Sequence, residues 1–112
     1  MAKCLLIYRT PHAAESKPPS EEEMKEMFVQ WQKWKESFSS QILDLGDGLL
    51  PTGRRLKDSM VSDGPHIEAK EVVGGFSIVE ADNYDAAVEV ARGCPITYVP
   101  GGEIEIREMA GF

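Results

Sequence analysis

The sequence lacks the features that identify membrane proteins, disulfide-rich scaffolds and metal sites. The apolar run near its start, Cys4 to Tyr8, has only five residues. That is well short of a membrane span of roughly 18 residues and of a signal-peptide core. Cys4 and Cys94 are too few for a disulfide framework and lie too far apart in the sequence for a metal motif. We therefore expect a cytoplasmic chain with both thiols reduced and no metal or cofactor.

Positive charge is also scarce. Twelve Lys and Arg residues stand against 19 Asp and Glu residues, which gives a formal net charge of −7. Phosphate-backbone binding needs clustered cations, and the basic group Arg54-Arg55 with Lys57 is too short to supply them. This argues against a nucleic-acid partner. The length of 112 residues, with 42% hydrophobic and 28% charged residues, predicts one globular domain over residues 1–112.

The first half of the chain predicts a strand, a loop and a long helix. Lys3 to Arg9 is short and apolar, as expected of a strand, and the segment from Thr10 to Pro19 carries three prolines. Ser20 and Glu23 form a capping box that opens a helix to about Ser39 or Ser40. Apolar residues follow at spacings of three and four, a pattern typical of one helix face: Met24, Met27, Phe28, Trp31, Trp34 and Phe38.

The second half predicts turns, strands and a shorter helix. Leu45 to Pro51 is expected to be a turn that enters a short strand, and Arg54 to Val61 a small hairpin with Lys57-Asp58 at its turn. A strand follows over Gly75 to Ala81. A helix capped by Asp82 or Asn83 then runs to a C-cap at Gly93. Glu103 to Glu108 alternates as a last strand, after a turn at Gly101-Gly102.

This order, βαββαβ with an inserted hairpin, is that of a ferredoxin-like α+β fold with an antiparallel sheet and both helices on one face. In the first strand Cys4, Leu6 and Tyr8 point to one face, and Leu5 and Ile7 to the other. Two helices can cover only one of these apolar faces. We therefore predict a symmetric homodimer that packs the open faces together.

Residues 62–81 hold the strongest candidate site. An Asp63-Gly64-Pro65 turn is followed by His66, Lys70 and Glu71, so that a cation and several hydrogen-bonding groups lie close together at a turn. Such a patch is either the rim of a site for a small polar ligand or a solvated turn whose charges pair with one another. Trp31 and Trp34 are expected in the core. The Cys94 thiol, at the negative end of a helix, is expected to have a raised pKa and to be buried.

Several short motifs carry a family likeness: Gly46-Asp47-Gly48-Leu49, Asp63-Gly64-Pro65, Glu68-Ala69-Lys70-Glu71, Gly74-Gly75-Phe76 and Ile104-Glu105-Ile106-Arg107. Together they resemble the DGPF branch of the YCII-related family. That resemblance implies a dimeric α+β barrel over nearly the whole chain. A His–Asp dyad of the other branch has no counterpart here, because Cys94 precedes Pro95 and the first helix has no histidine.

Three functional hypotheses follow. The first is a binding protein for a small polar molecule, in a dimer cleft edged by Asp63, His66, Lys70, Glu71, Tyr8 and Arg107. The second is a regulatory or protein-interaction module without a small ligand. The third is an enzyme that uses His66 with an acidic partner for proton transfer. We favour the first, then the second.

Overall fold

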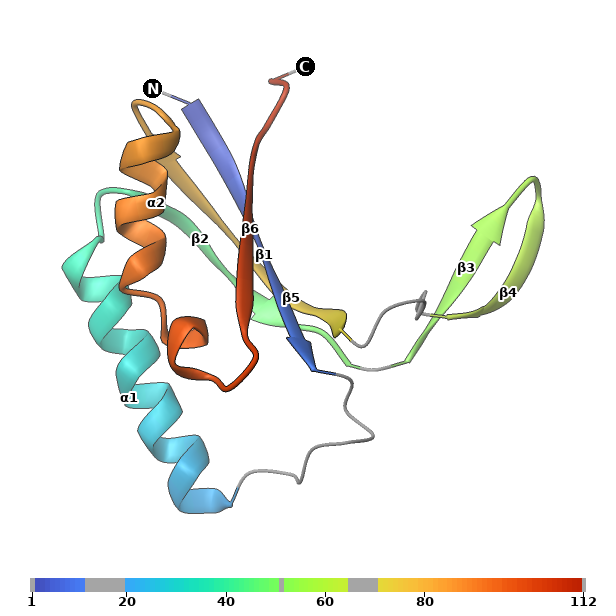
Figure 1. Ribbon diagram of the computed structural model, residues 1–112, viewed down its shortest axis with the longest axis horizontal. Helices are drawn as coiled ribbons and strands as arrows, with labels where there is room; N and C mark the ends of the chain where they lie inside the picture. The colour runs from blue at the N-terminus through green and yellow to red at the C-terminus, as the bar shows by residue number, and fades with distance from the viewer. Residues whose placement is uncertain (1, 12–19, 51, 65–70, 112) are drawn as a thin grey trace.

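The computed structural model describes residues 2–11, 20–50, 52–64 and 71–111. The elements in chain order are β1 (Ala2–Pro11), α1 (Glu21–Ser37), β2 (Ile42–Gly48), β3 (Gly53–Lys57), β4 (Met60–Gly64), β5 (Glu71–Ala81), α2 (Tyr84–Arg92), the 3₁₀ helix η2 (Pro95–Tyr98) and β6 (Glu103–Glu108). Four strands form an antiparallel sheet in the order β2-β5-β1-β6. Both helices cover one face of it (Figure 1). The predicted ferredoxin-like α+β fold is confirmed. In the parts of the chain given above, no helix combines the length and apolarity of a membrane span.

Both helices start at side-chain caps. The Ser20 hydroxyl accepts a hydrogen bond from the Glu23 N–H at 3.2 Å, and the Asn83 side chain accepts one from the Ala86 N–H at 2.8 Å. These bonds satisfy amide groups that have no partner within the helix. Gly93 does follow α2, but with a right-handed φ of −83°. Close packing explains why a glycine occupies this position, because a Cβ there would lie 3.2 Å from the Trp34 ring.

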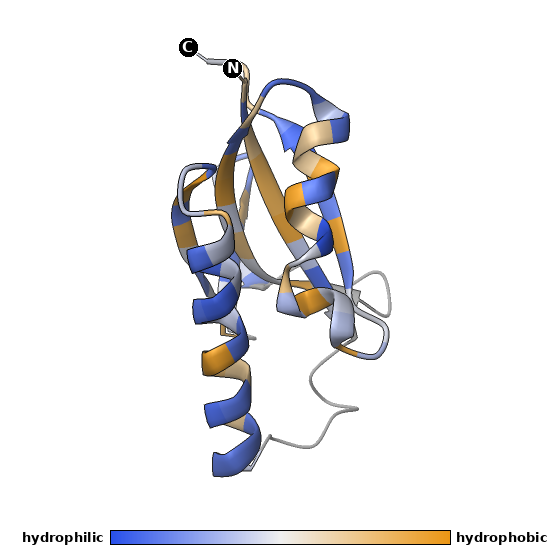
Figure 2. Ribbon diagram, turned by 90° about the vertical axis from the view of Figure 1, so that its left-hand side faces the viewer, coloured by the Kyte–Doolittle hydropathy of each residue, from blue (hydrophilic) through white to orange (hydrophobic). Residues whose placement is uncertain are grey.

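The core lies between the two helices and the sheet. Cys4, Leu6 and Tyr8 of β1 are buried there, together with Trp34 and the inner face of α2. Trp34 is a buried residue of α1, and its indole N–H donates to the Val90 carbonyl oxygen at 2.8 Å, which joins the two helices. Figure 2 shows hydrophobic residues concentrated in the strands behind the helices, whereas α1 is mostly hydrophilic. The predicted apolar stripe of α1 is therefore buried only toward its C-terminal end.

Two turns differ from the prediction. Residues 45–48 belong to β2, where we expected a turn, because the strand continues through bulges against β5 and Gly46 takes a φ of +74°. A bulge accommodates the extra residue without ending the strand. In the hairpin of β3 and β4, the turn residues are Asp58 and Ser59, one position later than expected. β1 extends through Thr10 to Pro11, into the predicted loop, and residues 12–19 lie outside the described residues.

Neither helix of the described residues lies on the second face of the sheet. Leu5 and Ile7 lie opposite Ile78 and Phe76 of β5, so these four side chains share this open face, on which all four are partly exposed. At its edge the Arg9 guanidinium contacts the Glu105 carboxylate at 3.2 Å. The alternation predicted for β1 is thus confirmed, and the homodimer inferred from it stays a prediction.

Candidate functional site

A pocket of about 370 Å³ lies between the N-terminal half of α1 and the end of the sheet where β2 finishes and β5 begins. The pocket is lined mostly by aromatic and aliphatic side chains and by the backbone of glycine residues, which no side chain covers. The lining residues are Tyr8, Met27, Phe28, Trp31, Gln32, Leu45, Gly46, Asp47, Gly48, Gly74, Gly75, Phe76 and Ile96. A concave, mostly apolar lining with few polar groups is usual for small-molecule sites.

Glycines form the floor of the pocket. Tyr8, Gly75 and Gly48 lie directly opposite one another across β1, β5 and β2, so all three face the helices. The two glycines leave the sheet surface bare beside the Tyr8 ring. A Cβ at Gly75 would lie 2.9 Å from the Asp47 carbonyl oxygen and 3.3 Å from the Tyr8 ring. At Gly48 the nearest heavy atom would be 3.7 Å away, so this position has free space.

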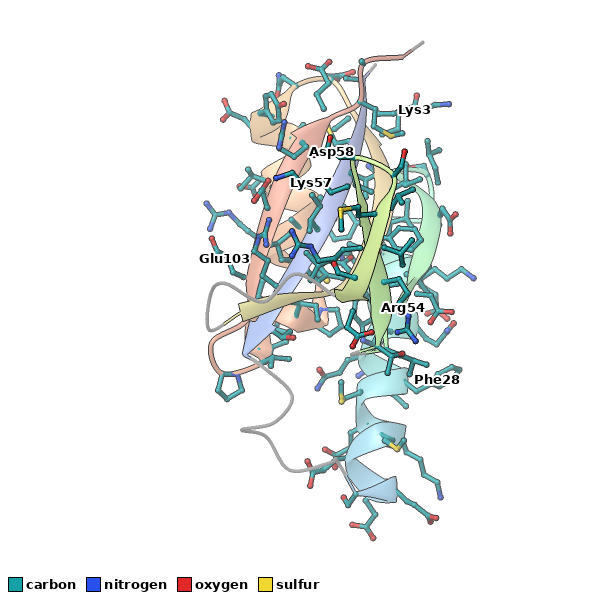
Figure 3. All side chains as sticks on the ribbon, turned by 90° about the vertical axis from the view of Figure 1, so that its right-hand side faces the viewer. Lys3, Phe28, Arg54, Lys57, Asp58 and Glu103 are labelled. Atoms are coloured by element: carbon teal, nitrogen blue, oxygen red, sulfur yellow. The ribbon has the colours of Figure 1, made fainter. Side chains whose placement is uncertain are left out.

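An aromatic row connects the pocket to the core. The Tyr8 and Trp31 rings meet edge to face with centroids 5.6 Å apart, and Trp31 meets Trp34 in the same way at 5.6 Å. Such pairs favour fixed ring orientations. Phe28, labelled in Figure 3, lies at the outer rim with 65% of its surface exposed. The inner wall is therefore held in place by the core, whereas the rim is open.

Beside the floor, on the same helix-covered face, Tyr8 belongs to a buried chain of hydrogen bonds. Its hydroxyl donates to the Ser77 oxygen, and the Ser77 hydroxyl donates to the Leu45 carbonyl oxygen. Burial raises the pKa of Tyr8 far above its usual range, and the nearby Cys94 thiol adds to this rise. Burial also raises the pKa of the Cys94 thiol. Both groups are protonated at neutral pH, so neither serves as a general base or a thiolate nucleophile.

We expect stability to fall at alkaline pH because of these groups. Tyr8 ionises at its usual value of 10.0 in the unfolded chain but stays protonated in the fold. The unfolded state then binds fewer protons, so the free energy of unfolding decreases as pH rises above that value, by up to about 1.4 kcal/mol per pH unit for one proton. Urea unfolding between pH 8 and 11 measures this slope. Tyr8→Phe should flatten it, and an unchanged slope in that variant would contradict the assignment to Tyr8.

The residues predicted for the site are not brought together. Tyr8 lines the pocket from the helix-covered face, but Arg107 lies opposite Leu5 on the open face and contacts Glu105 at 3.4 Å. Asp63 is near the end of β4, fully in solvent, with its carboxylate 3.8 Å from Arg54. Asp63 and Gly64 are thus strand residues and not part of a turn.

The other candidates from that segment are only partly placed. Glu71 begins β5, with its backbone paired to Pro11. Pro65, His66 and Lys70 lie outside the described residues. Sequence reasoning left Trp31 in the core and did not find Phe28, Leu45 or Gly48 as pocket residues. The repeated glycines were visible as motifs, but only the strand register brings Gly48 and Gly75 side by side.

Within residues 2–11, 20–50, 52–64 and 71–111, no group of three or more His, Cys, Asp or Glu side chains could hold a metal ion. These residues form a largely apolar cavity whose lining includes the side-chain amide of Gln32.

The strand order, the helices on one face and the pocket at the sheet end define a ferredoxin-like α+β domain with a small-molecule-sized cavity. The model of the YCII-related domain family matches residues 1–112, and the chain belongs to this family. The comparison with curated proteins gave no significant match.

Proposed function

We propose that this YCII-related protein binds a small molecule in the pocket between α1 and the β2-β5 end of the sheet, and that it does so as a symmetric homodimer. The observation that carries the binding proposal is the row Tyr8, Gly75 and Gly48 beneath Trp31. Two glycines side by side leave a flat, bare surface next to an aromatic ring. Glycine permits close approach of a ligand to the backbone.

The lining supports a flat, largely apolar ligand with one polar group. The volume of about 370 Å³ falls at the small end of the range for ligand sites. Hydrogen-bonding side chains in the lining are few, and they include the Gln32 amide. Asp47 contributes backbone to the lining, because it pairs with Phe76 and its side chain belongs to the open face, where its carboxylate accepts the Gly48 N–H at 2.8 Å. The sequence predicted a small polar ligand. The lining narrows this prediction to a ligand that also has an apolar body.

The homodimer is supported by the open face of the sheet. Its centre is apolar, with Leu5, Ile7, Phe76 and Ile78, and its edge carries the ion pair of Arg9 and Glu105. An apolar centre with a polar rim is the usual composition of a protein interface. The Asp63-Gly64-Pro65 motif supports placement in the DGPF branch, and two buried, unpaired cysteines support a cytoplasmic location. The enzyme hypothesis rested on His66, which lies outside the described residues, and burial keeps both Tyr8 and Cys94 protonated beside the pocket.

Substitution of Gly48 tests the binding proposal. Its Cβ position faces the pocket with no heavy atom closer than 3.7 Å, so a side chain there fills the cavity without a backbone clash. We expect 8-anilinonaphthalene-1-sulfonate to bind the wild type with energy transfer from Trp31 and from its neighbour Trp34. We expect this transfer to fall progressively in Gly48→Ala, Gly48→Val and Gly48→Phe. Thermal unfolding checks that each variant is folded.

Trp31→Phe is the matched control for the optical signal, because it keeps an aromatic wall and removes the tryptophan that lines the pocket, so the transfer should weaken to the share that Trp34 supplies from 5.6 Å behind it. Dye that binds Gly48→Phe as tightly as the wild type, with the same transfer, would contradict a site over the glycine floor. Absence of transfer in the wild type would contradict it as well.

A further inference from the structure

The hairpin of β3 and β4, Gly53 to Gly64, is a protruding arm. It leaves the sheet on the side away from the helices (Figure 1), and its two strands pack on each other and only marginally on any other helix or strand. The Cα radius of gyration is 15.2 Å, whereas a compact domain of this length has about 13 Å. The chain is therefore extended beyond its core.

The arm exposes apolar side chains that the described residues of its own chain leave uncovered. Leu56, Met60 and Val61 are 73%, 75% and 67% exposed. A two-stranded hairpin is at best marginally stable in water unless it packs on something else. Its turn adds strain, because Asp58 and Ser59 both have positive φ without being glycine. The arm thus lacks the packing that such a hairpin needs.

The two faces of the arm differ in chemistry. Leu56 lies opposite Val61, and Arg54 lies opposite Asp63, so these two pairs share one face. Arg55 and Lys57 alternate onto the other face, with Ser62 and Met60 as their partners. One face therefore presents an aliphatic pair near the tip, and the opposite face presents two cations.

We propose that the arm docks on a second copy of this chain, with its Leu56–Val61 face against the open face of that copy's sheet. The partner is a second copy because the chain itself presents an uncovered apolar surface of the matching kind, formed by Leu5, Ile7, Phe76 and Ile78. Figure 3 views the molecule from the side of the arm, on which Arg54, Lys57 and Asp58 are labelled. The arm stands in front of the open face of its own sheet but packs on that sheet only marginally. Under two-fold symmetry each copy both gives and receives an arm.

Charge supports the same partner. The arm carries three cations and two carboxylates, whereas the whole chain has a net charge of −7. At the border of the open face Glu105 is already paired with Arg9 and Arg107, and Glu103 on β6 adds a further carboxylate opposite Arg9. A basic arm on an acidic chain is attracted to another copy, whereas the two acidic bodies alone repel each other. This inference rests on the proposed homodimer and specifies its interface: the partner's arm lies between the two open faces and covers their apolar centre, whereas without the arms the sheets would pair directly.

The arm's share in assembly is measured by sedimentation equilibrium of the full chain. Leu56→Gln with Val61→Thr removes the apolar pair, and Met60→Gln is the matched control on the opposite face of the arm. We expect dimerisation to weaken about tenfold or more in the double variant and to stay within about twofold in the control. Near-UV circular dichroism checks that the sheet and helices are intact. Equal affinity of the double variant and the wild type would overturn the docking of the arm and leave the dimer standing.

Cross-linking identifies the surface that the arm contacts. Cys4 and Cys94 are buried, so a benzophenone maleimide on Ser59→Cys labels the arm tip alone. The benzophenone-bearing variant is prepared with natural nitrogen and with ¹⁵N, and the two are mixed in equal amounts. Contact between copies should give cross-links that join one ¹⁵N peptide to one peptide of natural mass. The acceptor peptides should contain Leu5 to Ile7 or Phe76 to Ile78. Cross-links only within one copy would overturn the proposal. A wild type that sediments as a monomer at every concentration would overturn both the arm docking and the homodimer, while the dye test of the pocket stays independent.

Discussion

Gly46→Ala should lower the free energy of unfolding by about 3 kcal/mol or more, which is at the severe end for one methyl group. Gly46 has a φ of +74°, and a Cβ there would lie 1.8 Å from the Phe76 carbonyl oxygen. The left-handed conformation alone costs a residue with a side chain roughly 1–2 kcal/mol. The clash is with the backbone of β5, so no side-chain rotation relieves it. Urea unfolding at neutral pH measures the change.

The same substitution should also disturb the pocket. Gly46 and Phe76 both line it, and a shift of β2 away from β5 would separate the two sides of the floor. Gly48→Ala is the matched control two residues along the strand, since its nearest contact would be 3.7 Å and its φ is not in the left-handed region. We expect the control to change stability by less than about 0.5 kcal/mol. Equal effects of the two alanines would contradict the bulged geometry of β2.

Trp34→Ala should lower the free energy of unfolding by about 3–5 kcal/mol, the range found for buried aromatic residues. Trp34 is 2% exposed and lies where α1, α2 and the sheet meet. Its removal leaves a cavity between the helices and deprives the Val90 carbonyl oxygen of its 2.8 Å hydrogen bond. For a domain of typical stability this is a large share of the total. Equilibrium unfolding followed by circular dichroism gives the change.

Trp34→Phe separates the contribution of ring packing from that of the hydrogen bond to Val90. Phenylalanine keeps most of the ring packing but cannot donate to Val90, so we expect a smaller loss of about 1–3 kcal/mol. Trp31→Ala is a second comparison, because Trp31 is only partly buried and lines the open pocket. A Trp34→Ala variant as stable as Trp31→Ala would show that the contact between the helices contributes little.

Local chemistry explains why the elements were predictable. Ser20 with Glu23 and Asn83 with Ala86 cap the helices through contacts within one turn, and short segments contain all of that information. The alternation of β1 also assigned Cys4, Leu6 and Tyr8 to one face before any partner strand was known. The candidate site was predicted less well. Tyr8 and Arg107 were placed in one cleft, yet they lie on opposite faces of the sheet.

The sequence by itself determined the order of strands and helices, the helix starts, the two-faced first strand and the family likeness, because each depends on neighbouring residues and on the periods of helix and strand. Only the tertiary structure decided which residues share a pocket. A strand's partners depend on register, and the bulges at Gly46 and between Tyr8 and Arg9 shift that register in a way that no local pattern reveals. The row of Tyr8, Gly75 and Gly48 beneath Trp31 and the exposed arm both follow from those long-range pairings.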